Sequence, residues 1–126
     1  MSLSIVSTSA APTPVGPYSQ AMVADRVVAT AGQVALHPET GAVPEGVEAQ
    51  TRLALSNLKA VLEAAGTDLQ HVFKTTCLLQ DMASFAEFNA VYAEVFGDHR
   101  PARSTFGVSL AGDFLVEVEA LAVLPD

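Results

Sequence analysis

The sequence predicts an α+β fold in which two helices cover one face of a mixed β-sheet. Runs of β-branched and apolar residues at 26–31, 71–79 and 101–123 predict strands. Between them, residues 48–65 and 84–96 carry apolar side chains at helical spacing, and a glycine follows each segment. Half of the 126 residues are hydrophobic, which suffices for one well-filled core, so we expect a single domain spanning residues 1–126.

The first part of the chain predicts turns and one strand. Residues 7–14 are rich in Ser, Thr, Ala and Pro and are turn-prone, and they lead into Gly-Pro-Tyr-Ser-Gln at 16–20. The run at 26–31 predicts a strand that ends at Gly32, and Pro-Glu-Thr-Gly at 38–41 predicts a further turn.

Two amphipathic helices follow, with a strand between them. The first, at 48–65, carries one largely apolar stripe and one polar stripe, and Gly66 supplies its end. In residues 71–79 the side chains on both faces of the predicted strand are mostly non-polar, which is typical of a central strand. In the second helix, Ser84 and Glu87 have the spacing of a capping box, and Gly97 ends the segment.

Residues 101–108 and 115–123 predict a C-terminal hairpin that carries one arginine and two carboxylates. Strand alternation places Arg103 and Thr105 on one face, and it places Glu117 and Glu119 together on one face of the second strand. A guanidinium is always charged and grips a carboxylate with two donors. The pattern therefore suits either a small anionic ligand or an internal ion pair between Arg103 and one of the two glutamates.

A sheet with both helices on one face leaves its other face uncovered. Because that face has to be buried, we expect a homo-oligomer in which the sheets pack together.

The composition limits the possible binding partners and the cellular compartment. The formal net charge of −8 and the absence of a basic patch argue against nucleic acid, because that affinity depends on Lys and Arg. Cys77 is the only cysteine, so no intramolecular disulfide forms and a cytoplasmic location is expected. We expect no signal peptide and no contact with a membrane, because no apolar run approaches about 20 residues.

Six short motifs together resemble the RidA (YjgF-type) reactive-intermediate deaminase family. They occur in the family's order over about 110 residues, so a chance match is very improbable. The resemblance implies a chorismate-mutase-like fold, a homotrimer with clefts between subunits, and cofactor-free hydrolysis of enamines and imines such as 2-aminoacrylate and 2-iminopropanoate to 2-oxo acids and ammonia. The motifs are Gly-Pro-Tyr-Ser-Gln at 16–20, Ala-Gly-Gln at 31–33, Lys-Thr-Thr at 74–76, Asn-Ala-Val-Tyr at 89–92, Pro-Ala-Arg-Ser at 101–104 and Val-Glu-Val-Glu-Ala-Leu-Ala at 116–122.

The resemblance also implies roles for individual residues. Arg103 matches the arginine that clamps the substrate carboxylate, and Glu117 matches the carboxylate associated with the attacking water; an ordinary pKa near about 4.3 would leave Glu117 ionised at neutral pH. Tyr18 and Asn89 match residues that line the cleft, although Tyr18 equally suits a turn anchor and Asn89 a hydrogen bond to a loop. Gly32 suits a tight turn or the close approach of a ligand.

Two substrate-binding positions depart from the family pattern. Ala31 stands where many members have serine, which removes one hydroxyl, and Thr105 stands where many have cysteine. The lost hydroxyl is expected to lower or redirect activity on the scale of one hydrogen bond, about 1 kcal/mol.

No cofactor or metal is expected, because the glycines form no phosphate loop and the histidines lack ligand spacing. Cys77 is expected to be a buried hydrophobe. Two other function classes stay open: a regulatory trimer that binds small carboxylates without turnover, and the ribonuclease activity ascribed to some family members, for which an acidic chain is poorly suited. A hydrolase of a related carbamate or aromatic enamine would use the same clamp.

Overall fold

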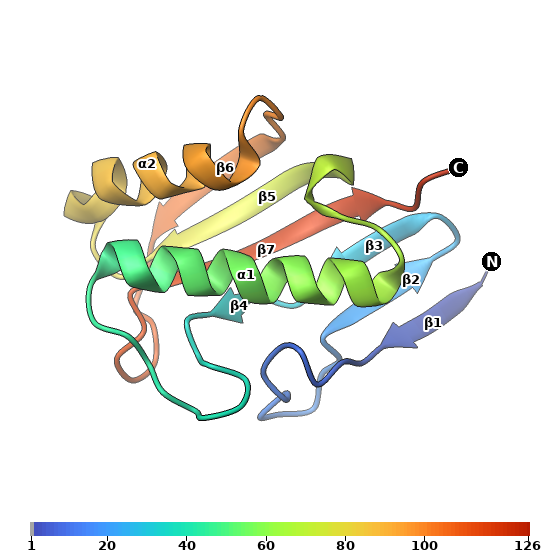
Figure 1. The fold of residues 1–126 in the computed structure, drawn as a ribbon, viewed down its shortest axis with the longest axis horizontal. Helices are drawn as coiled ribbons and strands as arrows, with labels where there is room; N and C mark the ends of the chain where they lie inside the picture. Colours follow the sequence, from blue (N-terminus) through green and yellow to red (C-terminus); the bar gives the residue numbers. More distant parts are fainter. Residues whose placement is uncertain (1) are drawn as a thin grey trace.

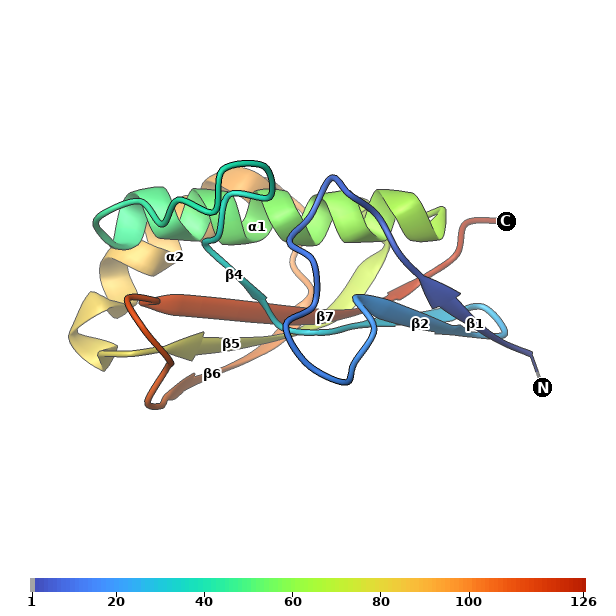
Figure 2. The ribbon, with the colours of Figure 1, turned by 90° about the horizontal axis from the view of Figure 1, so that it is seen from below.

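The computed structural model describes residues 2–126, which form one sheet with two helices packed on one of its faces (Figures 1 and 2). The predicted fold class is therefore confirmed. The strands are β1 (Leu3–Val6), β2 (Ala21–Ala24), β3 (Val27–Thr30), β4 (Gln33–Val34), β5 (Val72–Leu79), β6 (Ala102–Gly107) and β7 (Val116–Val123), and the helices are α1 (Val47–Ala65) and α2 (Phe85–Phe96), with short 3-10 turns at Leu69–His71 and Met82–Ser84.

The sheet runs in the order β1-β2-β3-β7-β5-β6, and β4 also pairs with β7. Every pair is antiparallel except β5 and β6, which are parallel. The predicted C-terminal hairpin is therefore wrong, because β5 lies between β6 and β7. The reason is topological: α2 carries the chain back across the sheet after β5, and a strand-helix-strand crossover makes the next strand parallel to the first.

Helix α1 forms as its apolar stripe predicts. Thr51, Leu55, Leu58 and Leu62 are completely buried against the sheet, and the helix ends at Gly66, which is left-handed with φ 95°. That conformation lets the amides of residues 66 and 67 satisfy two of the last carbonyls of α1.

The start of α2 differs from the predicted capping box. The Ser84 side chain makes no capping hydrogen bond, and the carboxylate of Asp81 instead accepts a hydrogen bond from the Ala83 amide, 2.9 Å away, at the preceding 3-10 turn. That turn tightens the chain before α2 begins, so the cap sits three residues earlier than the motif indicates. The predicted end at Gly97 is confirmed.

The two faces of the sheet differ in burial. On β7, Val116, Val118 and Ala120 are buried beneath the helices, whereas Glu117 and Glu119 point to the opposite face, as strand alternation predicts. The opposite face carries exposed apolar side chains. In residues 2–126 both helices lie on the other side of the sheet, so no helix covers this face (Figure 2). Its exposed large hydrophobic residues include Leu3, Ile5, Val27, Phe106, Leu121 and Val123.

Strands β1, β2 and β4 were not expected from the sequence. They are two to four residues long, and segments this short carry little periodic signal. The central strand β5 is partly open on one side, where Phe73 is 46% exposed at a β-bulge. Neither helix in residues 2–126 combines the length and hydrophobicity that crossing a membrane requires.

Candidate active site

Arg103 lies on β6 with its guanidinium packed against three aromatic rings of α2. The guanidinium carbon is 4.8 Å from the ring centre of Tyr92, 5.5 Å from that of Phe85 and 6.0 Å from that of Phe88. Such cation–π contacts hold a guanidinium without using its N–H donors. Within residues 2–126 no carboxylate forms an ion pair with Arg103. The donors of Arg103 are therefore free for an anionic ligand.

The aromatic cage around Arg103 is itself fixed to the sheet. The hydroxyl of Tyr92 shares a 2.8 Å hydrogen bond with the Oγ1 of Thr75, a completely buried side chain on β5. Thr75 lies directly beside Arg103 in the parallel ladder. Because the ring is anchored at its polar end and packed on its apolar face, the position of the arginine is set before any ligand binds.

A cavity of about 360 Å³ opens beside Arg103, between α2 and the start of β6. This volume matches sites for small molecules. Asn89, on the same side of α2 as Tyr92 and Ala93, also lines it, so the structure brings together two of the residues predicted to bind substrate. Thr105 points to the same face of β6 as Arg103 by strand alternation but does not line this cavity.

Glu117 lies on β7, on the face of the sheet opposite to the helices. Partial burial, and next the nearby charge of Glu119, raise the pKa of Glu117 above its ordinary value. The prediction of an ordinary pKa is therefore wrong, because a carboxylate partly removed from water holds its proton more tightly. A carboxyl group with a raised pKa is better suited to accept a proton from water near neutral pH.

Gly32 is the close neighbour of the Glu117 side chain. A Cβ at position 32 would lie 2.7 Å from the carboxyl carbon of Glu117 and would overlap one of its oxygens. Real side chains do not pack this tightly, so the absence of a side chain at Gly32 leaves the space that the carboxylate occupies. The sequence predicted a tight turn or the close approach of a ligand at Gly32, and the group that lies close to Gly32 in this chain is instead the side chain of Glu117.

We predict that Gly32→Ala displaces the Glu117 carboxylate. If this carboxylate has the catalytic role that the sequence predicts, the substitution lowers kcat/KM about tenfold to a hundredfold, the range expected for misplacing a reacting group. The backbone at Gly32 has no positive φ, so little loss of thermal stability is expected. The check is a double-mutant cycle with Glu117→Gln: the alanine has no further effect once the carboxylate is gone. Equal losses in both backgrounds would contradict this account.

Tyr18 lies close to Gly32 and is 51% exposed. Both residues line a second cavity, of about 100 Å³. The Tyr18 hydroxyl accepts a weak 3.4 Å hydrogen bond from the Val15 amide, which agrees with the turn-anchor interpretation and leaves the ring at the cavity. Ala31 does not line either cavity; its amide donates to the carbonyl of Gln20, 2.8 Å away.

Sequence reasoning missed the residue that holds the loop of Tyr18 in place. Gln20 is 2% exposed, and its side-chain oxygen accepts a 2.7 Å hydrogen bond from the Thr8 amide. Its side-chain nitrogen donates to the carbonyls of Thr8 and Pro12 at 3.0 and 2.9 Å. The signal was the glutamine that ends the 16–20 motif, since a polar side chain beside a turn often bonds to the turn's backbone.

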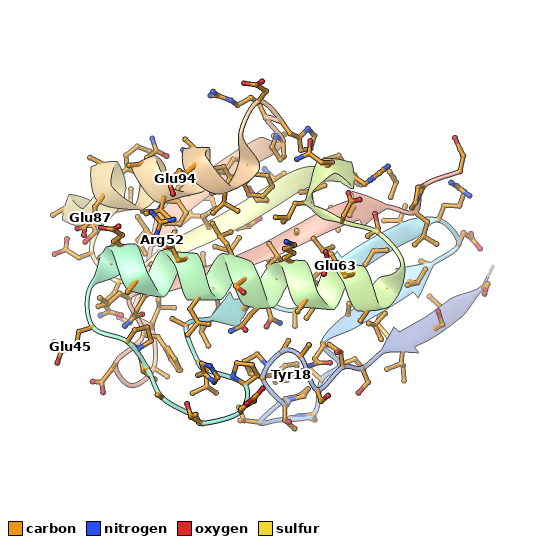
Figure 3. All side chains as sticks on the ribbon, in the orientation of Figure 1. Tyr18, Glu45, Arg52, Glu63, Glu87 and Glu94 are labelled. Carbon is orange, nitrogen blue, oxygen red and sulfur yellow. The ribbon has the colours of Figure 1, made fainter. Side chains whose placement is uncertain are left out.

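The candidate residues thus form two clusters, and these lie apart from each other within a single chain. Arg103 and Asn89 lie beneath and along α2, whereas Glu117 and Gly32 lie on the other face of the sheet. Figure 3 shows Tyr18 on the far side of α1 from α2. The alternative of an internal ion pair between Arg103 and Glu117 or Glu119 is wrong, because β5 separates their strands and the side chains point to opposite faces.

The remaining titratable side chains form no metal-binding cluster among residues 2–126. In the part of the chain that the structure describes, no three His, Cys, Asp or Glu side chains gather as metal ligands would. Cys77 is completely buried, and burial raises the pKa of its thiol to about 11, so it stays protonated and packs as a small hydrophobic residue, as predicted.

Comparison with known proteins identifies the family. Residues 8–124 match the family model described as Endoribonuclease L-PSP. The chain is 45% identical to a mouse protein named 2-iminobutanoate/2-iminopropanoate deaminase, over 94% of this chain and 90% of that protein. It is 41% identical to the Escherichia coli protein of that name, over 94% and 95% of the two chains. A RutC family protein of Pyrococcus horikoshii is 48% identical over 94% and 95%.

Solved structures agree. The E. coli YjgF gene product superimposes with a TM-score of 0.91 at 40% identity, covering 95% of this chain and 98% of that one. E. coli TdcF with bound serine superimposes with a TM-score of 0.92 at 38% identity, covering 97% and 99%. The match covers nearly the whole chain in sequence and in structure, so this protein belongs to the RidA (YjgF-type), or endoribonuclease L-PSP, family that its motifs predict.

Proposed function

We propose that this protein is a cofactor-free hydrolytic deaminase that converts 2-imino acids and their enamine tautomers, such as 2-iminopropanoate and 2-aminoacrylate, to 2-oxo acids and ammonia. The observation that carries the proposal is Arg103, a cation held by aromatic rings at a cavity of small-molecule size, with no carboxylate partner among residues 2–126. Relatives at 41–45% identity are named for this reaction.

The proposed site is completed by a second copy of the chain in a homotrimer. Arg103 and Asn89 of one subunit would face Glu117, Gly32 and Tyr18 of the next. Two features support this: the clusters lie on opposite faces of one sheet, and the face bearing Glu117 exposes apolar side chains that association would bury. In a ring, two different patches meet at every interface, so each interface would hold one complete site.

The chemistry needs one clamp and one base. The Arg103 guanidinium binds the substrate carboxylate with two parallel hydrogen bonds and so fixes the adjacent imine carbon. Glu117 accepts a proton from water as the water oxygen bonds to that carbon and the C=N electron pair moves to nitrogen, which takes up a proton from solvent water. The C–N bond then breaks and ammonia leaves with the proton from Glu117. The hydroxyl oxygen releases its proton to solvent water as the C=O group forms.

The departures at Ala31 and Thr105 bear on substrate choice. The side chain of Ala31 has no hydroxyl to bond to a substrate. Its backbone amide already donates a hydrogen bond to the carbonyl of Gln20. Thr105 retains a hydroxyl on the Arg103 face of β6. A related carbamate or aromatic enamine could occupy the same clamp, and the assay below should include an aromatic imine for that reason.

The decisive experiment is subunit complementation. Arg103→Ala and Glu117→Gln are each expected to retain at most about 1% of the wild-type activity alone. If the site lies between subunits, refolding an equal mixture restores intact sites at about a quarter of the interfaces, because each interface of a ring takes one patch from each of two subunits. The readout is the decay of 2-iminopropanoate, trapped with semicarbazide, in mixtures refolded from denaturant.

The control is a mixture of the two variants that is not unfolded first, which should stay inactive over a time in which labelled wild-type subunits are shown not to exchange. An active Arg103→Ala variant, or no recovery in verified mixed trimers, would contradict the site. Tight binding of 2-oxobutanoate by a wild-type protein that never accelerates imine decay would instead identify a carboxylate-binding regulatory trimer.

A further inference from the structure

The four arginines of this chain divide into two pairs. Arg26 forms an ion pair with Asp126 at 2.9 Å, and Arg52 bridges Glu94 at 2.5 Å and Glu48 at 3.5 Å. Figure 3 shows Arg52 on α1 near Glu94 of α2. Arg100 and Arg103 form no ion pair within residues 2–126.

The two unpaired arginines line the same cavity of about 360 Å³. Among the described residues, no aspartate or glutamate lines it, although the chain has 14 acidic residues and only six basic ones. Asn89, His99 and Tyr92 supply its other polar side chains, and Phe96 and Pro101 are among the apolar ones. In so acidic a protein, a cavity with two free guanidinium groups and no carboxylate is a local reversal of charge that favours anions.

One carboxylate does not account for both cations. A planar guanidinium satisfies both oxygens of a carboxylate, so Arg103 alone completes the clamp on the 2-imino acid group. Arg100 precedes β6 and lies three residues before Arg103, so their Cα atoms are at most about 11 Å apart. Long flexible side chains at that separation span a ligand with a negative group at each end.

We propose that Arg100 is a specificity residue that binds a second, distal carboxylate, so that the preferred substrates are 2-imino dicarboxylic acids such as 2-iminoglutarate. This inference rests on the proposed function for the reaction itself, which is unchanged: water adds to the C=N carbon, ammonia leaves, and the product is a 2-oxo dicarboxylic acid. The distal carboxylate takes no part in the bond changes. Its ion pair with Arg100 adds binding energy that a monocarboxylic substrate lacks.

The test compares 2-iminoglutarate with 2-iminopentanoate, which differ only in whether the chain ends in a carboxylate or a methyl group. Both are generated in place by amino-acid oxidases with catalase present, from glutamate and norvaline, and their decay is followed by semicarbazide trapping. We expect kcat/KM to favour the dicarboxylate about tenfold in the wild type, the scale of one charge-assisted hydrogen bond, and Arg100→Gln to remove that preference. Arg26→Gln, which changes the net charge equally outside the cavity, should retain it.

Binding of 2-oxoglutarate and 2-oxopentanoate, measured by calorimetry, tests the same site without turnover. Tighter binding of 2-oxoglutarate that depends on Arg100 supports the inference. An unchanged preference in Arg100→Gln, or inorganic phosphate binding as tightly as 2-oxoglutarate at equal ionic strength, overturns it and leaves the deaminase intact. If the protein accelerates the decay of none of the three imines, 2-iminoglutarate, 2-iminopentanoate and 2-iminopropanoate, the proposed function is overturned. Calorimetry then still tests whether Arg100 binds a second carboxylate.

Discussion

Arg103→Ala is expected to lower the kcat/KM for 2-iminopropanoate by at least about a hundredfold, because an unclamped substrate loses the orientation of its imine carbon. The structure gives this arginine no carboxylate partner within residues 2–126, so its removal breaks no ion pair. It leaves a gap against the rings of Phe85, Phe88 and Tyr92. The measurement is imine decay with 2-iminopropanoate generated in place.

Two controls separate the clamp from the packing. Sedimentation should show the same assembly for Arg103→Ala as for the wild type, and Arg26→Ala, which removes an exposed arginine elsewhere, should keep full activity. Arg103→Lys keeps the charge and loses the planar fork, so intermediate activity is expected. Wild-type turnover by Arg103→Ala would refute the clamp.

Glu117→Gln is expected to lower kcat by about a hundredfold to ten-thousandfold, the usual contribution of a positioned proton acceptor. In the wild type, activity should fall as the pH drops through the raised pKa of Glu117, so the acidic limb of the profile lies above the range of an ordinary glutamate. Burial is the main cause of the raised pKa and the charge of Glu119 the second. Glu119→Gln should therefore move the limb to lower pH without removing it.

The raised pKa of Glu117 also makes the free energy of unfolding depend on pH. The unfolded chain releases the Glu117 proton at the ordinary carboxyl pKa, whereas the folded chain keeps it to higher pH. The contribution of Glu117 to the free energy of unfolding therefore falls as the pH rises from its pKa in the unfolded chain to its pKa in the folded chain. The contribution is largest at a pH below both pKa values. Chemical denaturation at several pH values measures this, with Glu117→Gln as the matched control. A pH dependence identical in wild type and variant would contradict the assignment.

The elements with strong periodic signals were predictable from the sequence. The completely buried side chains of α1, the alternation of Glu117 and Glu119 with buried Val116 and Val118, and the glycine ends of both helices follow from local spacing and backbone preference. The short strands β1, β2 and β4 were not predictable, because their two to four residues form strands only when longer neighbours offer hydrogen-bond partners. The strand order was not predictable either, since a crossover between distant segments decides it.

The family, the fold class and the candidate residues were predictable from the sequence, because these depend on residue identity and order along the chain. The three-dimensional arrangement shows which of the candidates lie together. By inserting β5 between β6 and β7, it excludes an ion pair between Arg103 and Glu117 and places the two on opposite faces of the sheet. It also supplied the aromatic cage, the space that Gly32 leaves for Glu117 and the raised pKa of that carboxyl group. Each depends on distances between residues far apart in sequence, which local spacing does not encode.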